Sequence, residues 1–321
     1  MKKIVVIGSI NVDLVFHVEN FVKAKETISS KSMARFMGGK GLNQAIALSK
    51  AYPEVRLFGN ISKSDSHLKE EIKSFGVSTE LIESVEGDTG TAFIQVDKTG
   101  QNCIVLNKGV NHRFERARID EVLSSLHQGD MIVLQNEINE LEYIIQSAKV
   151  KGIKIAFNPS PFESKILDLP LGDTDYLIFN EVEGKMLAHF KEPDLILKTL
   201  HNRYPNTVLV LTLGADGVMA QADNVTYEIP SHKVQVVDTT AAGDAFSGYF
   251  LAGIQKGLSV IDALEMANAA GALTVTKAGT GIGTVTSNPA GISCGADCSQ
   301  VYNYNTAVTL TATPAAGSIF S

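Results

Sequence analysis

The chain has 321 residues, of which 44% are hydrophobic, and a formal net charge of −7 at pH 7. That length allows one large α/β domain or two ordinary ones with a sizeable core. The acidic balance argues against a nucleic-acid partner, and no stretch reaches the about 18 apolar residues that a membrane span needs. The apolar run after Lys3 is too short for a signal peptide, and three cysteines fit a reducing compartment. These features predict a cytoplasmic protein without nucleic-acid or membrane partners.

Short apolar runs alternate with helical patterns from the first residues to about residue 278. The predicted buried strands cover 4–7, 131–134, 153–157, 176–179 and 208–213. The predicted helices cover 41–51, 66–75, 116–126, 140–151 and 181–190. Because strands alternate with helices, we expect an α/β fold with a mostly parallel sheet covered on both faces. Ligands of such sheets bind beyond the carboxyl ends of the strands, so the chemistry should follow these runs.

Two pairs of segments break this alternation. Residues 14–22 and 34–37 look extended, as do 91–96 and 103–106, and neither pair has a covering helix. A turn at Asp97–Gly100 joins the second pair. The segments 14–37 and 89–107 therefore predict a small antiparallel sheet outside the main domain, which could act as a lid. An ordinary edge hairpin is the alternative.

The last 41 residues differ from the rest in composition. From Gly281 to Ser321 there is no Lys, Arg or Glu, and Asp297 is the only charged residue. Residues 307–313 alternate as a half-buried strand does. We therefore expect a main domain at 1–280 and a separate tail at 281–321. The tail resembles a β-rich repeat of bacterial cell-surface proteins, which suggests a fused or chimeric segment.

The segment from Asp238 to Phe246 consists largely of small residues and leads into a long helical pattern. Small residues let backbone N–H groups approach a ligand, and a helix N-terminus favours negative charge there. Asp244 lies in the first turn, beside whatever anion binds. A carboxylate next to an anion hole suits phosphoryl transfer to a hydroxyl, because the carboxylate takes the proton. The alternative is that Asp244 only caps the helix.

A second cluster, Gly38 to Gln44, opens the first predicted helix. It is not a Walker A loop, because Lys40 is followed by Gly41. Its glycines let the backbone approach a polar ligand, and Asn43 can both donate and accept hydrogen bonds. A purely structural turn is the alternative.

Asn11 and Asp13 directly follow the first predicted strand. They alternate, so both side chains should point to one face. A carboxylate with a neighbouring amide suits a vicinal diol, because the carboxylate accepts from two hydroxyls. An Asx turn is the alternative.

Three further positions follow predicted strands. Asn180 and Glu183 share a helix face and can hold the water shell of Mg²⁺, or they can form a capping box, or both. The turn Thr212–Gly217 can receive a nucleotide phosphate or ribose. Glu137 lies where the strand 131–134 ends.

Taken in chain order, these motifs resemble the ribokinase (PfkB) family of ATP-dependent sugar kinases. The matching pattern is Asn-x-Asp, Gly-Gly-Lys-Gly-x-Asn-Gln, Asn-x-x-Glu, Thr-Leu-Gly-x-x-Gly and Asp-Thr-x-Ala-Ala-Gly-Asp. The resemblance covers about residues 3–280. Within the family, Ser9–Asp13 and Gly41–Gln44 fit the ribokinase branch better than the phosphofructokinase branch.

The resemblance implies a ribokinase-like three-layer α/β/α fold with a small β-sheet lid. It also implies transfer of the γ-phosphoryl group of ATP to the primary hydroxyl of a sugar, here ribose to ribose 5-phosphate. Relatives that act on fructose, 2-keto-3-deoxygluconate, nucleosides or sugar phosphates are the alternatives. A non-catalytic surface protein is an alternative of another class. The family uses Mg²⁺ and commonly K⁺, and the lid implies a homodimer.

The resemblance also assigns roles to residues. Asp244 would be the catalytic base, and the backbone of Ala241, Ala242 and Gly243 would form the anion hole. The residues that would hold the sugar are Asn11, Asp13, Gly39, Lys40, Asn43, Glu137 and Asp244. The residues that would line the nucleotide and its phosphates are Asn180, Glu183, Thr212, Gly214, Gly217 and Asn268. Glu183 would bind Mg²⁺ through water, and Asp238 and Thr239 would hold the monovalent cation.

The chain departs from the family after Gly279. The family continues there with a cation-binding loop, whereas this chain has the uncharged tail.

Overall fold

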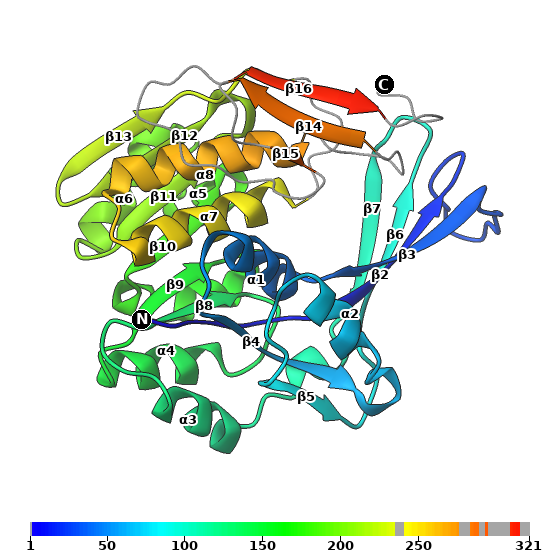
Figure 1. Cartoon of the computed structure of the whole chain (residues 1–321), viewed down its shortest axis with the longest axis horizontal. Helices are drawn as coiled ribbons and strands as arrows, with labels where there is room; N and C mark the ends of the chain where they lie inside the picture. Colours follow the sequence, from blue (N-terminus) through cyan, green and yellow to red (C-terminus); the bar gives the residue numbers. More distant parts are fainter. Residues whose placement is uncertain (1, 235–240, 276–282, 289–292, 295–308, 315–321) are drawn as a thin grey trace. The chain divides into compact units, whose positions relative to one another are not determined.

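The computed structural model describes residues 2–234, 241–275, 283–288, 293–294 and 309–314 (Figure 1). The chain divides into two compact units, Met1–Thr276 and Lys277–Ser321. Asp238, Thr239 and the segment 276–282, where a cation loop was expected, lie outside the described residues.

A large sheet forms the centre of the first unit. Its strands lie in the order β13-β12-β11-β10-β9-β8-β1-β4-β5, and every pair from β11 to β5 is parallel. β12 and β13 are antiparallel at one edge. The strands are β1 (Ile4–Ile7), β4 (Val55–Ser62), β5 (Ile82–Val85), β8 (Met131–Gln135), β9 (Lys154–Asn158), β10 (Tyr176–Asn180), β11 (Val208–Thr212), β12 (Val218–Ala222) and β13 (Val225–Ile229).

Helices cover both faces of this sheet (Figure 1). One face packs against α1 (Lys40–Ala51), α2 (Leu68–Ser74), α7 (Ala242–Lys256) and α8 (Val260–Val275). The other packs against α3 (Arg116–Ser124), α4 (Leu141–Val150), α5 (Glu181–Ala188) and α6 (Pro193–Arg203).

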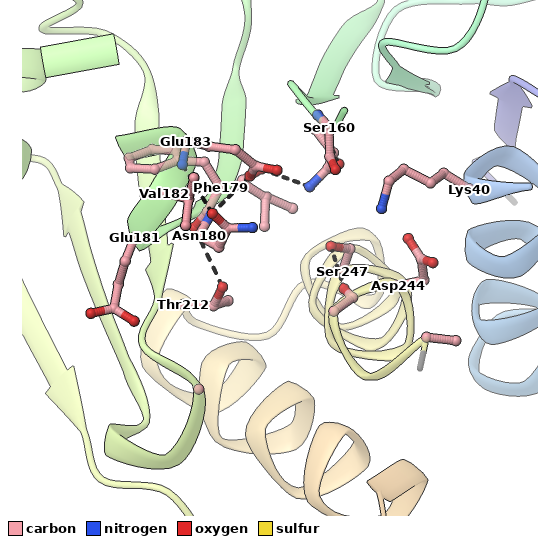
Figure 2. Close-up of a pocket in the computed structure, with 15 residues that line it drawn as sticks. Lys40, Ser160, Phe179, Asn180, Glu181, Val182, Glu183, Thr212, Asp244 and Ser247 are labelled. Atoms are coloured by element: carbon pink, nitrogen blue, oxygen red, sulfur yellow. Dashed lines mark hydrogen bonds between the residues drawn. The ribbon is translucent and has the colours of Figure 1, made fainter. Parts of the chain in front are cut away.

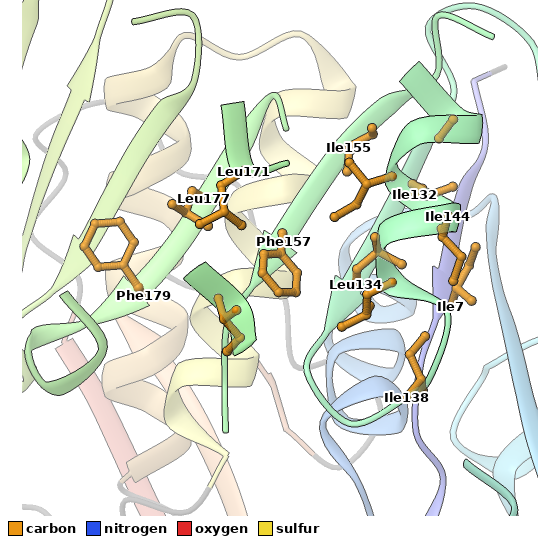
Figure 3. Close-up of a cluster of buried hydrophobic side chains, with 14 of the residues drawn as sticks. Ile7, Ile132, Leu134, Ile138, Ile144, Ile155, Phe157, Leu171, Leu177 and Phe179 are labelled. Atoms are coloured by element: carbon orange, nitrogen blue, oxygen red, sulfur yellow. The ribbon is translucent and has the colours of Figure 1, made fainter. Parts of the chain in front are cut away.

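Two hydrophobic cores result from the alternation of strand side chains. In β1, Ile4 and Val6 join the core under α1 and α7, whereas Val5 and Ile7 join the opposite core. Successive strand residues point to opposite faces, so a strand buried on both sides must be apolar throughout. Figure 3 shows the second core, in which Phe157 and Phe179 from the sheet lie among aliphatic side chains. The expected mostly parallel, doubly covered sheet is confirmed.

All five strands and five helices of the predicted alternation are present, with ends shifted by at most two residues. β4, α6 and the hairpin β12–β13 were not predicted. Gly59 and Asn60 interrupt the apolar run of β4, yet Asn60 is buried because its amide donates to the Val110 carbonyl, 3.2 Å away. The hairpin turns through Asp223 and Asn224, which both have positive φ as a two-residue hairpin turn requires.

A separate four-stranded sheet extends from the main domain and is called the lid sheet below (Figure 1). Its strands β2 (Asn11–His17), β3 (Ser32–Gly38), β6 (Gly90–Val96) and β7 (Asn102–Asn107) lie in the order β3-β2-β6-β7. The predicted small sheet is confirmed, although its central pair, β2 and β6, is parallel. Both strands leave the carboxyl-terminal edge of the main sheet, after β1 and β5, and therefore run in the same direction.

The second unit contains β14 (Gly283–Asn288), β15 (Ser293–Cys294) and β16 (Thr309–Pro314). They form a small antiparallel sheet in the order β15-β14-β16. β16 overlaps the strand predicted at 307–313. The boundary near residue 280 and the likeness to surface-protein repeats stay predictions. Among the described helices, none has the length and apolar character needed to cross a membrane.

α1 and α7 touch directly at Gly248. A Cβ atom added to Gly248 would lie 2.5 Å from the Ala47 Cβ and 3.0 Å from the Leu48 backbone nitrogen. Real Cβ atoms do not come so close, so only glycine allows this separation of the two helices. Asp244 lies one turn earlier on α7, and the contact therefore sets its distance from α1.

Gly248→Ala is expected to lower the free energy of unfolding by about 1 kcal/mol or more, because overpacking of about 1–3 kcal/mol outweighs the helix propensity of alanine. Gly243→Ala on the same helix is the control, since an added Cβ there meets nothing within 4 Å. It should gain up to about 1 kcal/mol. Urea denaturation measures both. A Gly248→Ala protein as stable as the Gly243→Ala protein would contradict the close contact.

Candidate active site

A cavity of about 420 Å³ opens where β9, β10 and β11 end and α7 begins (Figure 2). This is the edge of the sheet at which the sequence predicted the chemistry. Its lining residues are Lys40, Asn158, Ser160, Ile178, Phe179, Asn180, Glu181, Val182, Glu183, Thr212, Gly214, Ala241, Gly243, Asp244 and Ser247.

Asp244 lies in the first turn of α7 and is 7% exposed. Its Oδ1 accepts a hydrogen bond from Gln44 Nε2 at 3.0 Å, and its Oδ2 accepts a longer one from Asn43 Nδ2 at 3.4 Å. The N-cap of α7 is Ala241, which has φ 60° and makes no side-chain cap. Asp244 is therefore held by side chains of α1 and does not serve as the helix cap.

The start of α7 is open on the cavity side. Gly243 is exposed and, in the described part of the chain, an added Cβ would meet no atom within 4 Å. Its carbonyl accepts from the Ser247 hydroxyl at 2.8 Å. The first N–H groups of a helix have no partner within the helix and favour an anion. Lys40 and Asp244 both reach this space in Figure 2.

The glycines before α1 have a packing reason. A Cβ on Gly38 would lie 2.0 Å from the Asp13 Oδ2, and one on Gly41 would lie 2.4 Å from the Ser9 nitrogen. Gly39, the N-cap of α1, has φ 93°, which disfavours other residues. These glycines let α1 begin directly against the segment that follows β1. The backbone of the Gly38–Gln44 motif therefore has the structural role of a turn, while the Lys40 side chain lines the cavity.

Two carboxyl groups, Asp13 and Glu137, form an acidic pair beside these glycines. Burial, and then the charge of Glu137, raises the pKa of Asp13 to about 6. Within the described residues, Asp13 Oδ1 is buried without a hydrogen-bond partner. Glu137 accepts from the Ser9 hydroxyl and from the Lys40 backbone nitrogen, the latter at 3.0 Å. Asp13 therefore keeps a buried acceptor without a partner, whereas Glu137 is bound by groups of the protein.

Asn11 and Asp13 both lie in β2 and share a face, as predicted; the Asx turn is not formed. Asn111 lies in the 3₁₀ turn Gly109–His112, which follows β7. It donates through Nδ2 to Asn11 Oδ1 at 2.7 Å. Its own Oδ1 accepts from the Ile10 nitrogen at 3.0 Å. The oxygen of Asn11 is therefore occupied, and its NH₂ group is the part left to face a ligand.

Asn180 and Glu183 form the capping box that the sequence allowed. The Asn180 side chain accepts from the Glu183 nitrogen at 3.0 Å, and Glu183 Oε2 accepts from the Asn180 nitrogen at 2.9 Å. Both residues line the cavity, and Glu183 is buried. Capping and a role toward a bound group are thus compatible.

The predicted nucleotide residues are placed unevenly. Thr212 and Gly214 line the cavity, and the Thr212 hydroxyl donates to the Phe179 carbonyl at 3.4 Å. Gly217 is not among the lining residues; it has φ 106°, and a Cβ there would lie 2.1 Å from the Ile229 oxygen. Asn268 is buried in α8 and donates to the Pro230 carbonyl at 2.8 Å. The nucleotide roles of these residues stay predictions.

Three residues of the site could not be assigned a role from the sequence. Asn111 and Gln135 meet Asn11 and Gln44 only through pairings across about 100 and 90 positions of the chain. Gln44 stands inside the glycine motif, but its role is visible only once α7 lies beside α1. Tertiary contact, not local pattern, identifies these three.

The sequence matches the model of the pfkB family carbohydrate kinases over residues 1–287. The chain belongs to the PfkB family of carbohydrate kinases. It is a sugar kinase, a phosphotransferase, and its fold is that of the ribokinases.

Individual relatives agree with this assignment. The ribokinase of Lactococcus lactis subsp. lactis is 33% identical over 284 residues, which is 87% of this chain and 92% of that protein. The structure of Cryptococcus neoformans var. grubii ribokinase with ADP is 32% identical, with a TM-score of 0.76 over 87% of this chain and 95% of the other. Arabidopsis thaliana ribokinase with ribose and ATP is 26% identical, with a TM-score of 0.75 over 87% and 94%.

Glu137→Gln is expected to lower the pKa of Asp13 below 6, because it removes the negative charge beside it. The pKa should stay above the ordinary 3.8, since burial is the larger cause of the shift. Carboxyl-carbon NMR titration measures it. Glu228→Gln, on the edge strand β13, is the control and should leave Asp13 unchanged. An unaltered Asp13 pKa in Glu137→Gln would contradict the pairing.

Proposed function

We propose that this PfkB-family kinase transfers the γ-phosphoryl group of ATP to the primary hydroxyl of ribose and forms ribose 5-phosphate. The observation that carries the proposal is the buried Asp244 carboxylate at the open start of α7. The similarity to ribokinases over most of the chain supports ribose as the sugar. We place the kinase domain at residues 1–280, with the tail at 281–321 outside it. The reaction belongs in the cytoplasm, where ATP is made and used.

Asp244 acts as the general base. Its Oδ1 is engaged by Gln44, so Oδ2 is the oxygen that accepts the proton of the sugar hydroxyl. The hydroxyl oxygen forms a bond to the γ-phosphorus as the bond from that phosphorus to the bridging oxygen of ADP breaks. The proton ends on Asp244, and ADP leaves with the electron pair of the broken bond.

The start of α7 stabilises the charge on the moving group. The backbone N–H groups of Ala241, Ala242 and Gly243 would form the anion hole at the open start of the helix, where an added Cβ on Gly243 meets nothing. The Lys40 ammonium group lines the same cavity. Preorganised donors of this kind are worth about 3–4 kcal/mol each in a water-excluded site.

Asp13 and Asn11 recognise the sugar. Asp13 has a buried oxygen without a partner and accepts from neighbouring hydroxyls, while Asn11 presents its NH₂ group. Gly39 allows the sugar to approach the backbone closely. Asn43 donates to Asp244 Oδ2, and Glu137 accepts from the Lys40 backbone nitrogen and so fixes the loop at the start of α1.

Sugar affinity is expected to fall as the pH drops below about 6, because hydroxyl donors bind the ionised Asp13 carboxylate and its pKa is about 6. Above that pH the affinity should be constant. Calorimetric titration with ribose on either side of this pH tests it. Equal affinity on both sides would contradict the role of Asp13.

ATP and Mg²⁺ would bind in the part of the cavity lined by Asn180 and Glu183. The buried Glu183 carboxylate and the Asn180 amide line it, and Mg²⁺ takes few protein ligands and keeps several waters. When bound, Mg²⁺ neutralises charge on the phosphates. Thr212, Gly214, Gly217 and Asn268 belong to the nucleotide side.

We also propose that Asp238 and Thr239 hold K⁺ beside the anion hole. Chelation of Mg²⁺ should abolish turnover, and replacing K⁺ by tetramethylammonium should lower kcat. A rate independent of K⁺ would remove that part of the proposal.

A homodimer through the lid sheet completes the proposal. On the lid face opposite Asp13, the cross-strand neighbours Phe93 and Val105 and the nearby Met33 are exposed. A second copy would bury these side chains and leave the Asp13 face for the sugar. Light scattering should give twice the mass of the chain, and the monomer mass would refute the dimer.

Asp244→Asn is expected to lower kcat by at least about 10³-fold, within the range for loss of a general base, with ribose affinity nearly unchanged. Asp194→Asn is the matched control, because Asp194 is also a first-turn aspartate, in α6, away from the cavity. It should keep full activity. Coupled ADP release and calorimetry measure the two effects. An active Asp244→Asn enzyme would exclude Asp244 as the base.

The competing sugars are separated by one experiment. Ribose, fructose, 2-keto-3-deoxygluconate, a nucleoside and a sugar phosphate are each tested with ATP at equal concentration. We expect the highest kcat/KM for ribose. A higher value for another acceptor would change the substrate but keep the kinase, whereas no turnover with any acceptor would favour the non-catalytic alternative.

A further inference from the structure

Behind Asp244 lies a chain of two buried amides. Gln44 Nε2 donates to Asp244 Oδ1 at 3.0 Å, and Gln135 Nε2 donates to Gln44 Oε1 at 2.7 Å. Gln44 is 1% exposed and Gln135 is fully buried. Gln44 comes from α1 and Gln135 from the end of β8, so the two hydrogen bonds link three separate elements, α7, α1 and β8. Buried glutamine is uncommon, and two in sequence call for a reason.

We propose that Gln44 and Gln135 are positioning residues that hold the Asp244 carboxylate in one orientation and reserve Oδ2 for the proton of the substrate hydroxyl. The inference deepens the proposed function and rests on Asp244 as the base.

The Asp244 carboxylate sets the donor-to-acceptor direction of these two hydrogen bonds. An ionised carboxylate only accepts hydrogen bonds, so Gln44 must turn its NH₂ group to Asp244 and its oxygen to Gln135. Gln135 must then donate in turn. Its own oxygen faces Gly8, where an added Cβ would lie 2.3 Å away, and has no hydrogen-bond partner among the described residues. Neither amide can reverse without leaving a buried mismatch.

This arrangement prepares Asp244 to act as a general base. It occupies Oδ1, which leaves Oδ2 with only the long 3.4 Å contact to Asn43. Successive amide donors polarise one another and strengthen the bond nearest the carboxylate.

The other charges that face Asp244 are few and stay fixed in the test. In the described part of the chain, Lys40 from α1 and Glu181 and Glu183 from α5 line the same cavity. The final part of α8, residues 266–275, packs near the start of α7 and carries no charged side chain. None of these groups is altered when Gln44 is replaced, so a changed kcat reports the loss of the amide.

Gln44→Leu should lower kcat about 10- to 100-fold, the loss expected for one hydrogen bond to a charged group. The KM for ribose should stay nearly unchanged, because Gln44 acts through Asp244 and not on the sugar. Gln135→Leu should give the same change at smaller size. The isosteric Gln44→Glu should lower kcat further, because it puts a like charge in place of the donor, and it guards against misfolding of the leucine variant.

Gln255→Leu is the matched control. Like Gln44 and Gln135, Gln255 is a buried glutamine, and it donates to the Gly129 carbonyl at 3.0 Å. It belongs to α7 and lies about 16 Å along that helix from Asp244. It should lose stability but keep kcat and the KM for ribose.

The possible outcomes distinguish a failure of the positioning role from a failure of Asp244 as the base. If the Gln44 variants fold and their kcat matches that of Gln255→Leu, the amides are structural and the inference fails. If Asp244→Asn itself stays active, the proposed base fails together with the inference. If Asp244→Asn is inactive and both Gln44 variants lower kcat with the KM for ribose nearly unchanged, the positioning role is supported.

Discussion

The close contact of α1 with α7 at Gly248 is the constraint on which the site depends. It allows the two helices to approach until the Ala47 backbone and the glycine are in van der Waals contact. One turn away, Asp244 then meets Gln44 and Asn43 of α1. α1 also begins against the strand segment that carries Asp13. One packing contact therefore fixes the distance between the start of α7, which carries Asp244, and α1, which begins beside Asp13.

The polar groups of the site are kept buried by a small number of specific partners. Glu137 is bound by Ser9 and by the Lys40 backbone, Asn11 by Asn111, and Asp244 by Gln44. Asp13 and Gln135 each keep one buried oxygen without a partner among the described residues, and Asp13 has a raised pKa. The contrast is physically useful, because a buried group without a partner costs stability that a bound hydroxyl restores.

The alternation of strands and helices and most candidate residues could be predicted from the sequence, because apolar runs and glycine motifs are local signals. β4 could not, since Gly59 and Asn60 break its apolar pattern and the buried Asn60 amide group donates to the carbonyl of the distant Val110. The parallel pairing of β2 with β6 and the amides Gln135 and Asn111 likewise depend on contacts across many residues. A linear pattern contains no information on which buried polar group will meet which partner.

The most direct test is a crystal structure of the chain with ribose and a non-hydrolysable ATP analogue. The account predicts the primary hydroxyl oxygen of ribose at about 2.6–3.2 Å from Asp244 Oδ2, with the γ-phosphorus beyond it and near the Gly243 nitrogen. A sugar bound with another hydroxyl at Asp244, or bound away from Asp13 and Asp244, would contradict it.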